Sequence, residues 1–420
     1  MAGLPVGISL PNGNTTPGVE PLPWAELDAL APPEPDRSEG PASAQARWRP
    51  FGQPREAVRV VLIRDHHAWC PYCQKVWLWL EERRVPYRVE TVSMVCYGSK
   101  EAWYTRLVPS GMLPALVLDG RLITESDRIL AALEEAFGPL GARLDDPAVQ
   151  RLRQLERDLF RAWCGWLCGQ APESMAAADY DRRAGSFAAA LGTDAGGPWL
   201  LRTFSSADVV AIPFLERMQA SLLYYKGYDL RGRWPAIDRW FRGLEERPSW
   251  RGSRSDHHTH AHDLPPQLGG CCSNGSAEAL AWARRIDHGP WDGLNDALGV
   301  AGPADAAEAL GRVLRHRRTL LQVRPDLGDA ALRAALTRLA TGRPCAPPAG
   351  SAAGLRGLRD RICVPRDMGV LAARTLRQAL EDTAALDGDA QGDPLPRRHR
   401  HDQDPRPFRP TDPGLPHTGP

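Results

Sequence analysis

Two cysteines separated by two residues are the first feature of this sequence that could do chemistry. Cys70 and Cys73 lie in the run Cys-Pro-Tyr-Cys, after the β-branched stretch 58–64 and at the start of a largely apolar stretch that runs to Arg84. A thiolate attacks disulfides, and the free N–H groups at the start of a helix stabilise that anion. The proline after Cys70 suits the first position of a helix. The spacing therefore predicts a thiol–disulfide site in which Cys70 attacks and the more buried Cys73 is able to resolve a mixed disulfide.

Half of a zinc site is the other interpretation of this motif. Such a site needs a second pair of ligands at suitable spacing, and the sequence has no second Cys-x-x-Cys run. A cysteine pair that follows a strand and opens a helix favours the redox interpretation.

Two short runs further along the chain bear on what Cys70 faces. Leu113-Pro114 precedes the third predicted strand; in a thioredoxin-like domain a proline at this place is cis, and the residue before it offers its backbone to a bound peptide. Glu125-Ser126 begins a predicted helix, whose free N–H groups and serine hydroxyl are able to hold a carboxylate. Ser126 is equally well explained as an ordinary N-cap, so spacing alone leaves both roles open.

The elements that would position these residues follow one another as β-α-β-α-β-β-α. The predicted segments are strands at 58–64 and 87–92, helices at 73–84, 99–107 and 126–137, and a hairpin of 115–118 and 121–123 with an Asp-Gly turn. From Asp145 to Trp250 the apolar residues recur at helical spacing, and Ser205 with Asp208 predicts a capping box. The predicted fold class is therefore α+β, with a thioredoxin-like domain, an all-α domain and a helical extension.

Composition limits the partners and the domain organisation. The 420 residues carry a formal net charge of +1 and include nine cysteines. This charge balance favours neither nucleic acid nor a membrane surface as a partner, and no apolar run is long enough to predict a membrane span. The scattered, odd-numbered cysteines favour a reducing compartment such as the cytoplasm. The predicted regions are a flexible Pro-rich extension (1–56), a thioredoxin-like domain (57–140), an all-α domain (145–250), a His- and Cys-rich linker loop (251–276), a helical extension (277–383) and a disordered tail (384–420).

With these motifs the chain resembles a cytosolic-type glutathione transferase. A cysteine where that family usually has serine or tyrosine is similar to the omega-like branch, and the likeness is greater to the iota class of photosynthetic organisms. The resemblance rests on the runs 69–82 and 109–115 and on the segment 256–271. Tyr72 departs from it, because many iota members have tryptophan there. For a chain from a eukaryotic alga, a plastid is the alternative location.

The resemblance implies glutathione as the co-substrate and assigns the residues that bind it. Leu113, before Pro114, would bind the cysteinyl part through its backbone, while Glu125 and Ser126 would hold the γ-glutamyl end. Lys100 is similar to the omega-class lysine that neutralises the glycyl carboxylate; without the resemblance it is an ordinary surface lysine. Tyr72 completes the implied glutathione-binding set.

A cysteine nucleophile implies an oxidoreductase more than a conjugating enzyme. Because Cys70 would form a disulfide with glutathione, thiol transfer, deglutathionylation and dehydroascorbate reduction are favoured. The substrates would be small-molecule or protein mixed disulfides, and a homodimer is compatible with this chemistry. The alternative is a redox or regulatory binding protein that holds a glutathione-ligated iron–sulfur cluster or another metal with Cys70 as a ligand.

The substrate is expected between the two domains, where several aromatic residues are candidates for the pocket. These candidates are Trp103, Trp163, Trp166, Tyr224, Tyr225 and Tyr228. Each of them is also explained as an ordinary core residue.

A histidine-rich segment near position 260 has residue types that bind metals. The weak candidate ligands are His257, His258, His260, His262 and Cys271. Imidazoles spaced by two residues near acids and thiols suit zinc, copper or iron. The other interpretation is a polar loop whose histidines hydrogen-bond to the backbone and pack against the helical domain.

Overall fold

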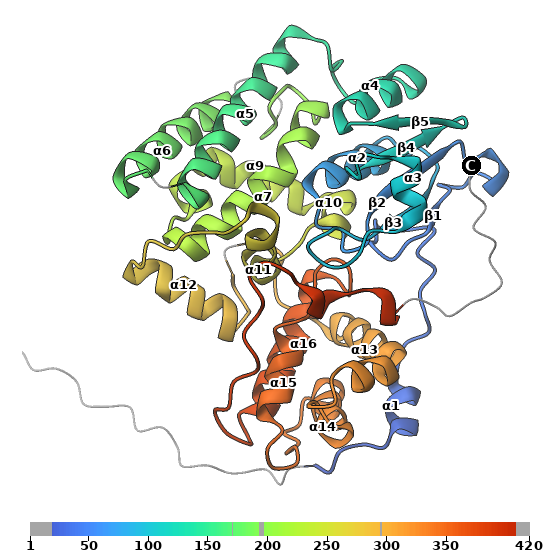
Figure 1. Ribbon diagram of the computed structural model, residues 1–420, viewed down its shortest axis with the longest axis vertical. Coiled ribbons are helices and arrows are strands. Elements are labelled where there is room, and N and C mark those ends of the chain that lie inside the picture. Colours follow the sequence, from blue (N-terminus) through green and yellow to red (C-terminus); the bar gives the residue numbers. More distant parts are fainter. Residues whose placement is uncertain (1–18, 170, 193–196, 295, 409–420) are drawn as a thin grey trace, which may run out of the picture.

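The computed structural model describes residues 19–169, 171–192, 197–294 and 296–408, which form two lobes (Figure 1). One lobe contains the sheet and the helices of residues 71–253, and the other contains the helices of residues 303–384 together with α1 (Trp24–Leu30). Helix α11 (His257–Leu268) lies between the two lobes, and α12 (Ala277–His288) packs beside it on α7 (Ser206–Lys226). Residues 1–18 of the extension predicted to be flexible and residues 409–420 of the tail predicted to be disordered lie outside the described part of the chain.

A five-stranded mixed sheet forms the base of the thiol site. Its strands are β1 (Trp48–Arg49), β2 (Val60–Asp65), β3 (Tyr87–Val92), β4 (Ala115–Leu118) and β5 (Arg121–Thr124), in the order β1-β3-β2-β4-β5. β2 and β3 are parallel, whereas β4 pairs antiparallel with β2 and β5. With α2 (Pro71–Glu82), α3 (Ala102–Leu107) and α4 (Ser126–Phe137), these strands confirm the predicted thioredoxin-like order.

Helix α2 is buried along most of its length, which explains its continuous apolar sequence. It packs on β2, on α4 and on α7 of the helical domain. Trp77 and Trp79 are both buried, and the indole of Trp79 donates to Ser206 Oγ at 3.2 Å. Full burial of such aromatic side chains contributes strongly to stability, so the first turn of α2 rests on a rigid base.

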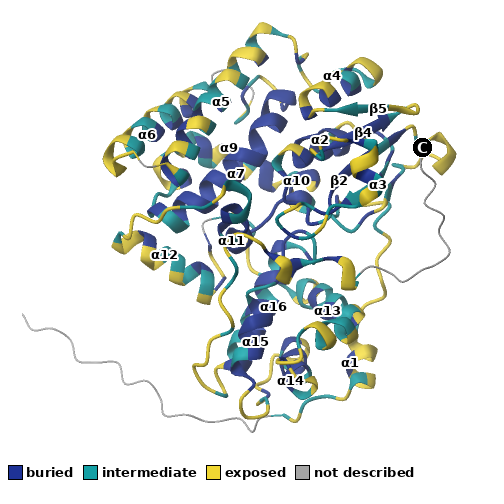
Figure 2. Ribbon diagram, in the orientation of Figure 1, coloured by how far each residue is buried: buried dark blue, intermediate teal, exposed yellow. Residues whose placement is uncertain are grey.

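The helical domain surrounds one central helix, α7 (Figure 2). Its helices are α5 (Pro147–Cys168), α6 (Glu173–Ala190), α7 (Ser206–Lys226), α8 (Leu230–Arg233), α9 (Pro235–Glu245) and α10 (Pro248–Ser253). The capping box predicted at the start of α7 is confirmed: the carboxylate of Asp208 accepts from the Ser205 backbone N–H at 3.0 Å, and Ser205 caps the helix in return. The all-α character predicted for this region is thus confirmed.

The prediction of a linker loop at 251–276 is wrong for the central part of this segment. Residues His257–Leu268 form helix α11, which Asp256 caps by accepting the Thr259 N–H at 2.8 Å. The run looks unlike a helix because Pro265 and Pro266 remove two backbone donors near its end. Burial against α7 and α12 (Ala277–His288) outweighs this low local propensity.

The N-terminal extension, predicted to be flexible up to residue 56, is ordered from residue 19 onward. Helix α1 (Trp24–Leu30) buries Leu27 among the helices α13 (Pro303–Val323) and α14 (Asp329–Thr341). Strand β1 adds to the sheet, where buried Arg49 donates to both carboxylate oxygens of Glu81 at 2.8 Å. The order comes from these contacts with distant parts of the chain, which a Pro-rich sequence without periodicity does not reveal.

The tail predicted as disordered from residue 384 is also placed, as far as residue 408. The extension ends with α15 (Ala352–Arg359) and α16 (Val370–Ala384), and the short turns His401–Gln403 and Arg406–Phe408 follow; a further short turn, Arg55–Ala57, precedes β2. The chain returns to the first lobe, where the Arg400 N–H donates to the Cys96 carbonyl at 2.8 Å and the Gln403 carbonyl binds the ring of His67 at 2.8 Å. In the described ranges, no helix combines the length and the apolar character needed to cross a membrane.

Candidate active site at the start of helix α2

Cys70 stands at the N-cap of α2, with Pro71 as the first helical residue, as the sequence predicts. Its side chain is 7 % exposed, and its thiol donates to the Leu113 carbonyl at 4.0 Å. No side chain caps this end of the helix, so the first N–H groups of α2 are open to the sulfur or to a ligand. The sulfur therefore lies between a helix start and the loop that precedes β4.

Cys73 lies one turn further along and is almost completely buried. Burial, with a hydrogen bond to Cys70, raises the pKa of the Cys73 thiol well above its ordinary value, so this group keeps its proton at neutral pH. The Cys73 sulfur lies within 4.8 Å of the Cys70 sulfur. The two cysteines therefore differ in their surroundings: Cys70 lies at the open start of the helix, whereas Cys73 is a buried thiol that keeps its proton.

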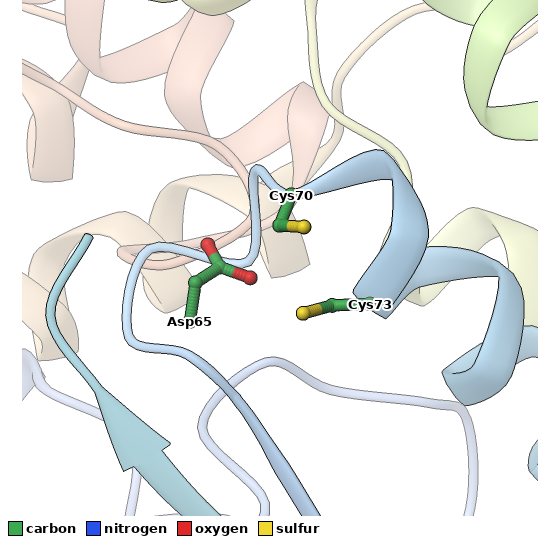
Figure 3. A group of neighbouring side chains, drawn as sticks. All are labelled: Asp65, Cys70 and Cys73. Carbon is green, nitrogen blue, oxygen red and sulfur yellow. The ribbon is translucent and has the colours of Figure 1, made fainter. Parts of the chain in front are cut away.

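Asp65, at the end of β2, lies beside both cysteines and was missed by sequence reasoning (Figure 3). One carboxylate oxygen and the two sulfurs all lie within 4.8 Å of one another, and the Cys73 sulfur is directed toward the carboxylate. Asp65 Oδ2 accepts from the Trp69 N–H at 2.6 Å, while Oδ1 is buried without a hydrogen-bond partner among the described residues. A carboxylate next to a buried thiol is able to take its proton.

One cation and a second carboxyl group complete the surroundings of the thiols. Arg217 of α7 is buried and donates to the carbonyl of Trp69 and to Gln74 Oε1 at 2.8 Å. Burial lowers the pKa of Arg217, and the charges of Glu216 and the thiols oppose that shift. Asp263 of α11 is buried too, and burial raises its pKa well above the ordinary value. Sequence reasoning missed Arg217 and Asp263, because only the tertiary fold brings α7 and α11 to this loop.

Several residues assigned to glutathione lie around Cys70. The Leu113–Pro114 bond is cis, as predicted, with the Leu113 carbonyl facing the sulfur. The Lys100 ammonium donates to the Gly111 carbonyl at 2.7 Å, and burial lowers its pKa. Lys100 therefore lies against the same loop as Leu113.

The Glu125-Ser126 pair begins α4 with its N–H groups uncapped by any side chain. Ser126 is buried, and Glu125 has a positive φ of 66°, a conformation that costs energy for a residue with a side chain. Lys75 of α2 pairs with Asp127, in the first turn of α4. This ion pair fixes the start of α4 relative to the helix that carries the cysteines.

Tyr72 is 37 % exposed and packs edge-on against Phe214 with ring centroids 5.5 Å apart. It lies in the first turn of α2, between the two cysteines in sequence and at the surface of the site. Its role in glutathione binding stays a prediction, because exposure of the ring at this place does not by itself make it a binding residue.

The six aromatic candidates for a substrate pocket take positions that favour the core interpretation. Trp163 donates to Ser221 Oγ at 2.9 Å and Trp166 to Glu173 Oε1 at 2.7 Å, inside the helical domain. Trp103 packs with the cluster of apolar residues from β2, β3 and β4. The hydroxyls of the three tyrosines bind elsewhere: Tyr224 to Asp287, Tyr225 to the Ala261 carbonyl and Tyr228 to Asp181. The structure does not bring these six residues together at Cys70.

The candidate metal ligands do not converge as a set either. His260 binds Glu216 Oε1 at 2.8 Å, and burial lowers the pKa of His257, which lies near Asp296, to about 4. A hydrogen bond joins the thiols of Cys271 and Cys168. Only His258 and His262 of the five share one place, together with Asp287, a residue that sequence reasoning missed.

Comparisons with known proteins match the part of the chain that holds this site. The family pattern described as "Glutathione S-transferase, N-terminal domain" matches residues 69–136, and that described as "Glutathione S-transferase, C-terminal domain" matches residues 155–252. The Arabidopsis thaliana protein "Glutathione S-transferase DHAR3, chloroplastic" is 26 % identical over 199 residues, which are 44 % of this chain and 69 % of that protein. The Oryza sativa protein "Probable glutathione S-transferase DHAR2, chloroplastic" is 26 % identical over 169 residues, 40 % of this chain and 59 % of that one.

Among solved structures, the omega 3C glutathione transferase of Trametes versicolor superposes with a TM-score of 0.43 at 23 % identity, over 52 % of this chain and 98 % of that one. The dehydroascorbate reductase of Chlamydomonas reinhardtii gives 0.40 at 20 % identity, over 47 % of this chain and 92 % of that one. The family patterns, with the thioredoxin-like order and the all-helical domain behind it, lead to one conclusion. Residues 69–136 and 155–252 of this chain match the N-terminal and C-terminal domains of glutathione S-transferases.

Proposed function

We propose that the chain is a glutathione-dependent thiol–disulfide oxidoreductase, a thioltransferase with Cys70 as its nucleophile. One observation carries the proposal: Cys70 lies at an uncapped helix start, and its sulfur is within 4.8 Å of the sulfur of the buried Cys73. Serine or tyrosine at this place would activate the thiol of glutathione, whereas a cysteine forms a disulfide with it. The match of residues 69–136 and 155–252 to the two glutathione S-transferase domains supports glutathione as the co-substrate.

The proposed cycle has two exchanges. The Cys70 thiolate attacks the glutathione sulfur of a mixed disulfide; the old S–S bond breaks, the substrate leaves as a thiolate that takes a proton, and Cys70 is glutathionylated. The thiolate of a second glutathione then attacks the glutathione sulfur of this adduct, which releases oxidised glutathione and the Cys70 thiolate. In each turnover one mixed disulfide and one glutathione become the substrate thiol and one oxidised glutathione, so the disulfide bond passes from the substrate to glutathione.

The bound glutathione would lie along the loop before β4 and across the starts of α2 and α4. The Leu113 carbonyl, 4.0 Å from the Cys70 sulfur, would accept from the backbone of the cysteinyl residue. The open start of α4 and the hydroxyl of Ser126 would hold the γ-glutamyl carboxylate. Lys100 uses one of its three N–H donors on the Gly111 carbonyl, so two remain for the glycyl carboxylate.

Cys73 would act beside this cycle. After losing its proton it would attack Cys70 in the glutathionylated state, release the glutathione thiolate and leave a Cys70–Cys73 disulfide, which two glutathione molecules reduce again. The chain would work in a reducing compartment, cytoplasm or plastid, where glutathione is kept reduced. The alternative role as an iron–sulfur or metal protein at Cys70 has no specific observation in its favour.

Turnover with a small glutathione mixed disulfide tests the proposal. We expect Cys70→Ser to lower kcat/KM by at least about 10³-fold, because the nucleophile is lost, and Cys73→Ser to retain most of the activity. Cys272→Ser, which removes an exposed thiol, serves as the matched control. Full activity in Cys70→Ser, or loss of activity in Cys73→Ser alone, contradicts the assignment of roles. A brown protein whose visible absorption depends on Cys70 would favour the iron–sulfur alternative.

Dehydroascorbate is a second substrate to test with the same variants. Its reduction by the same cysteine would also produce oxidised glutathione, so the two activities should be lost together in Cys70→Ser. Loss of only one of them would separate dehydroascorbate reduction from thiol transfer.

A further inference from the structure

Helix α11 presents two imidazoles one turn apart. His258 and His262 are four residues apart and therefore lie on the same face of the helix. Their ring centroids are 4.6 Å apart. His258 is buried, whereas His262 is partly exposed, so the pair reaches from the interior to the surface of the junction between the lobes.

Helix α12 supplies a carboxylate to the same place. Asp287 Oδ1 lies 2.8 Å from His262 Nε2, and one donor atom each of His258, His262 and Asp287 all lie within 4.8 Å of one another. The hydroxyl of Tyr224, from α7, donates to Asp287 Oδ2 at 2.8 Å. Three packed helices thus fix two nitrogen donors and one oxygen donor around a common point.

We propose that His258, His262 and Asp287 bind a divalent transition-metal ion of the zinc class. Two imidazoles and a carboxylate are a donor set that suits zinc, cobalt and ferrous iron. Three protein ligands leave at least one coordination position for water or another small ligand. The hydroxyl of Tyr224 would orient the carboxylate from outside the ligand set, as partners of metal ligands commonly do.

Burial lowers the pKa of His258, and the nearest arginines add to this shift and so disfavour positive charge there, but each of them is paired with a carboxylate that offsets this effect. The arginines closest to His258 each pair with a carboxylate: Arg377 with Asp256, Arg359 with Glu381 and Asp360, and Arg400 with Asp402. The partners of the Asp287 carboxylate are His262 and Tyr224, and no arginine among the described residues forms an ion pair with it. On binding, the ion would replace the proton between His262 and Asp287, and that proton would leave to solvent.

This site is separate from the thiol chemistry. Its three ligands come from α11 and α12, whereas Cys70, Cys73 and Asp65 come from α2 and β2. The metal site therefore does not depend on the proposed thioltransferase function, and loss of the ion would leave the nucleophile in place. An ion at this place would join the start of the helical extension to the first lobe.

Binding of Co²⁺ to the full-length, tag-free, chelator-treated protein tests the proposal. Visible absorption of Co²⁺ at a low coordination number, together with calorimetry, should show about one ion per chain, and excess Zn²⁺ should displace it. We expect His262→Gln and Asp287→Asn each to weaken binding by at least about tenfold and Tyr224→Phe to weaken it by about tenfold. His288→Gln, which removes an exposed imidazole next to Asp287 in sequence, should bind as the wild type does.

The results of this experiment distinguish a metal site from a hydrogen-bond network that binds no metal. Circular dichroism of each variant confirms folding, and a variant that fails to fold is replaced by the double variant His262→Gln/Asp287→Asn in a comparison of Zn²⁺-dependent melting temperature. No ion bound by the wild type, or equal binding by the wild type and the folded ligand variants, overturns the proposal. Equal loss of binding in His288→Gln would also overturn it, because the ligand set would then be a different one.

Discussion

Two helices of the first lobe begin in opposite ways. Helix α2 begins at Cys70, which makes no side-chain cap and whose thiol lies 4.0 Å from the Leu113 carbonyl in the loop before β4. Helix α11 begins at Asp256, which accepts the Thr259 N–H and pairs with buried Arg377. An uncapped helix start leaves backbone N–H groups free for a thiolate or a ligand, whereas at a capped start these groups bind a side chain of the protein itself. The comparison assigns chemistry to the first and stability to the second.

The difference also concerns charge. At α2 the important group is the buried Cys73 thiol, whose pKa is raised well above its ordinary value. Around α11 the important groups are buried carboxylates, Asp256 and Glu216, that remain ionised to low pH. The two regions should therefore respond differently to pH and to the loss of single partners.

Acid should act first on the region of α11. Burial alone would raise the pKa of Asp256, but Arg377 and Thr259 hold it at about 2; likewise His260 and Arg217 hold the pKa of Glu216 at about 2 despite burial. Both values lie below those of the unfolded chain, so this stabilisation is present above about pH 4 and is lost as the pH falls toward 2. The two groups together contribute about 5 kcal/mol at neutral pH. Urea unfolding at several pH values measures it.

A wild-type free energy of unfolding that is constant between pH 5 and about pH 3 would contradict this expectation. Glu216→Gln is the matching variant, because it should lose less further stability on acidification than the wild type.

Removal of Arg377, the partner of Asp256 at the start of α11, should lower the free energy of unfolding by nearly as much as acidification does. Arg377→Met leaves the Asp256 carboxylate buried and uncompensated, and breaking such a pair costs about 3–5 kcal/mol. Urea unfolding at neutral pH checks the value. The double variant Arg377→Met/Asp256→Asn should recover part of the loss, because the uncompensated charge is then gone. A single variant as stable as the wild type would show that Asp256 has other sufficient partners.

The two regions also differ in how far sequence reasoning reaches. The thiol site was predictable because its parts are local: a cysteine pair at a strand–helix junction, Leu113-Pro114 before a strand and Glu125-Ser126 at a helix start. The order of strands and helices around it follows from short-range patterns. The partners of the thiols, Asp65, Arg217 and Asp263, required the tertiary fold; only Asp65, a polar residue at the end of a buried strand, left a signal in the sequence.

The region of α11 was mispredicted because its order comes from distant contacts. Its prolines and histidines indicate a loop, and Arg377, the partner of its N-cap, lies 121 residues further along the chain. The same holds for the extension before β2 and for residues 384–408, whose positions depend on contacts with other parts of the fold. Local propensity fails where burial supplied by remote segments decides the structure.

The open helix start makes a kinetic prediction for Asp65. If its carboxylate takes the Cys73 proton, Asp65→Asn should slow formation of the Cys70–Cys73 disulfide from the glutathionylated enzyme by about 10²-fold. The amide keeps an acceptor for the Trp69 N–H, so the loop should hold its shape. Rapid quenching with an alkylating agent and mass spectrometry follows the step, and its rate should rise more steeply with pH in the variant. An unchanged rate and pH profile would remove Asp65 from the reaction.

The smallest expected effect is a loss of stability at alkaline pH. It contrasts with the region of α11, which should lose stability in acid. Burial raises the pKa of the Cys73 thiol well above that of the unfolded chain, so the stability it contributes is complete below about pH 8.5 and declines as the pH rises, because the unfolded thiol then ionises. The slope for one proton is about 1.4 kcal/mol per pH unit. The free energy of unfolding of the wild type should therefore decline more steeply than that of Cys73→Ala above this pH. Subtracting the two curves cancels other buried thiols and tyrosines, and parallel curves would mean that Cys73 ionises in the fold as readily as in the unfolded chain.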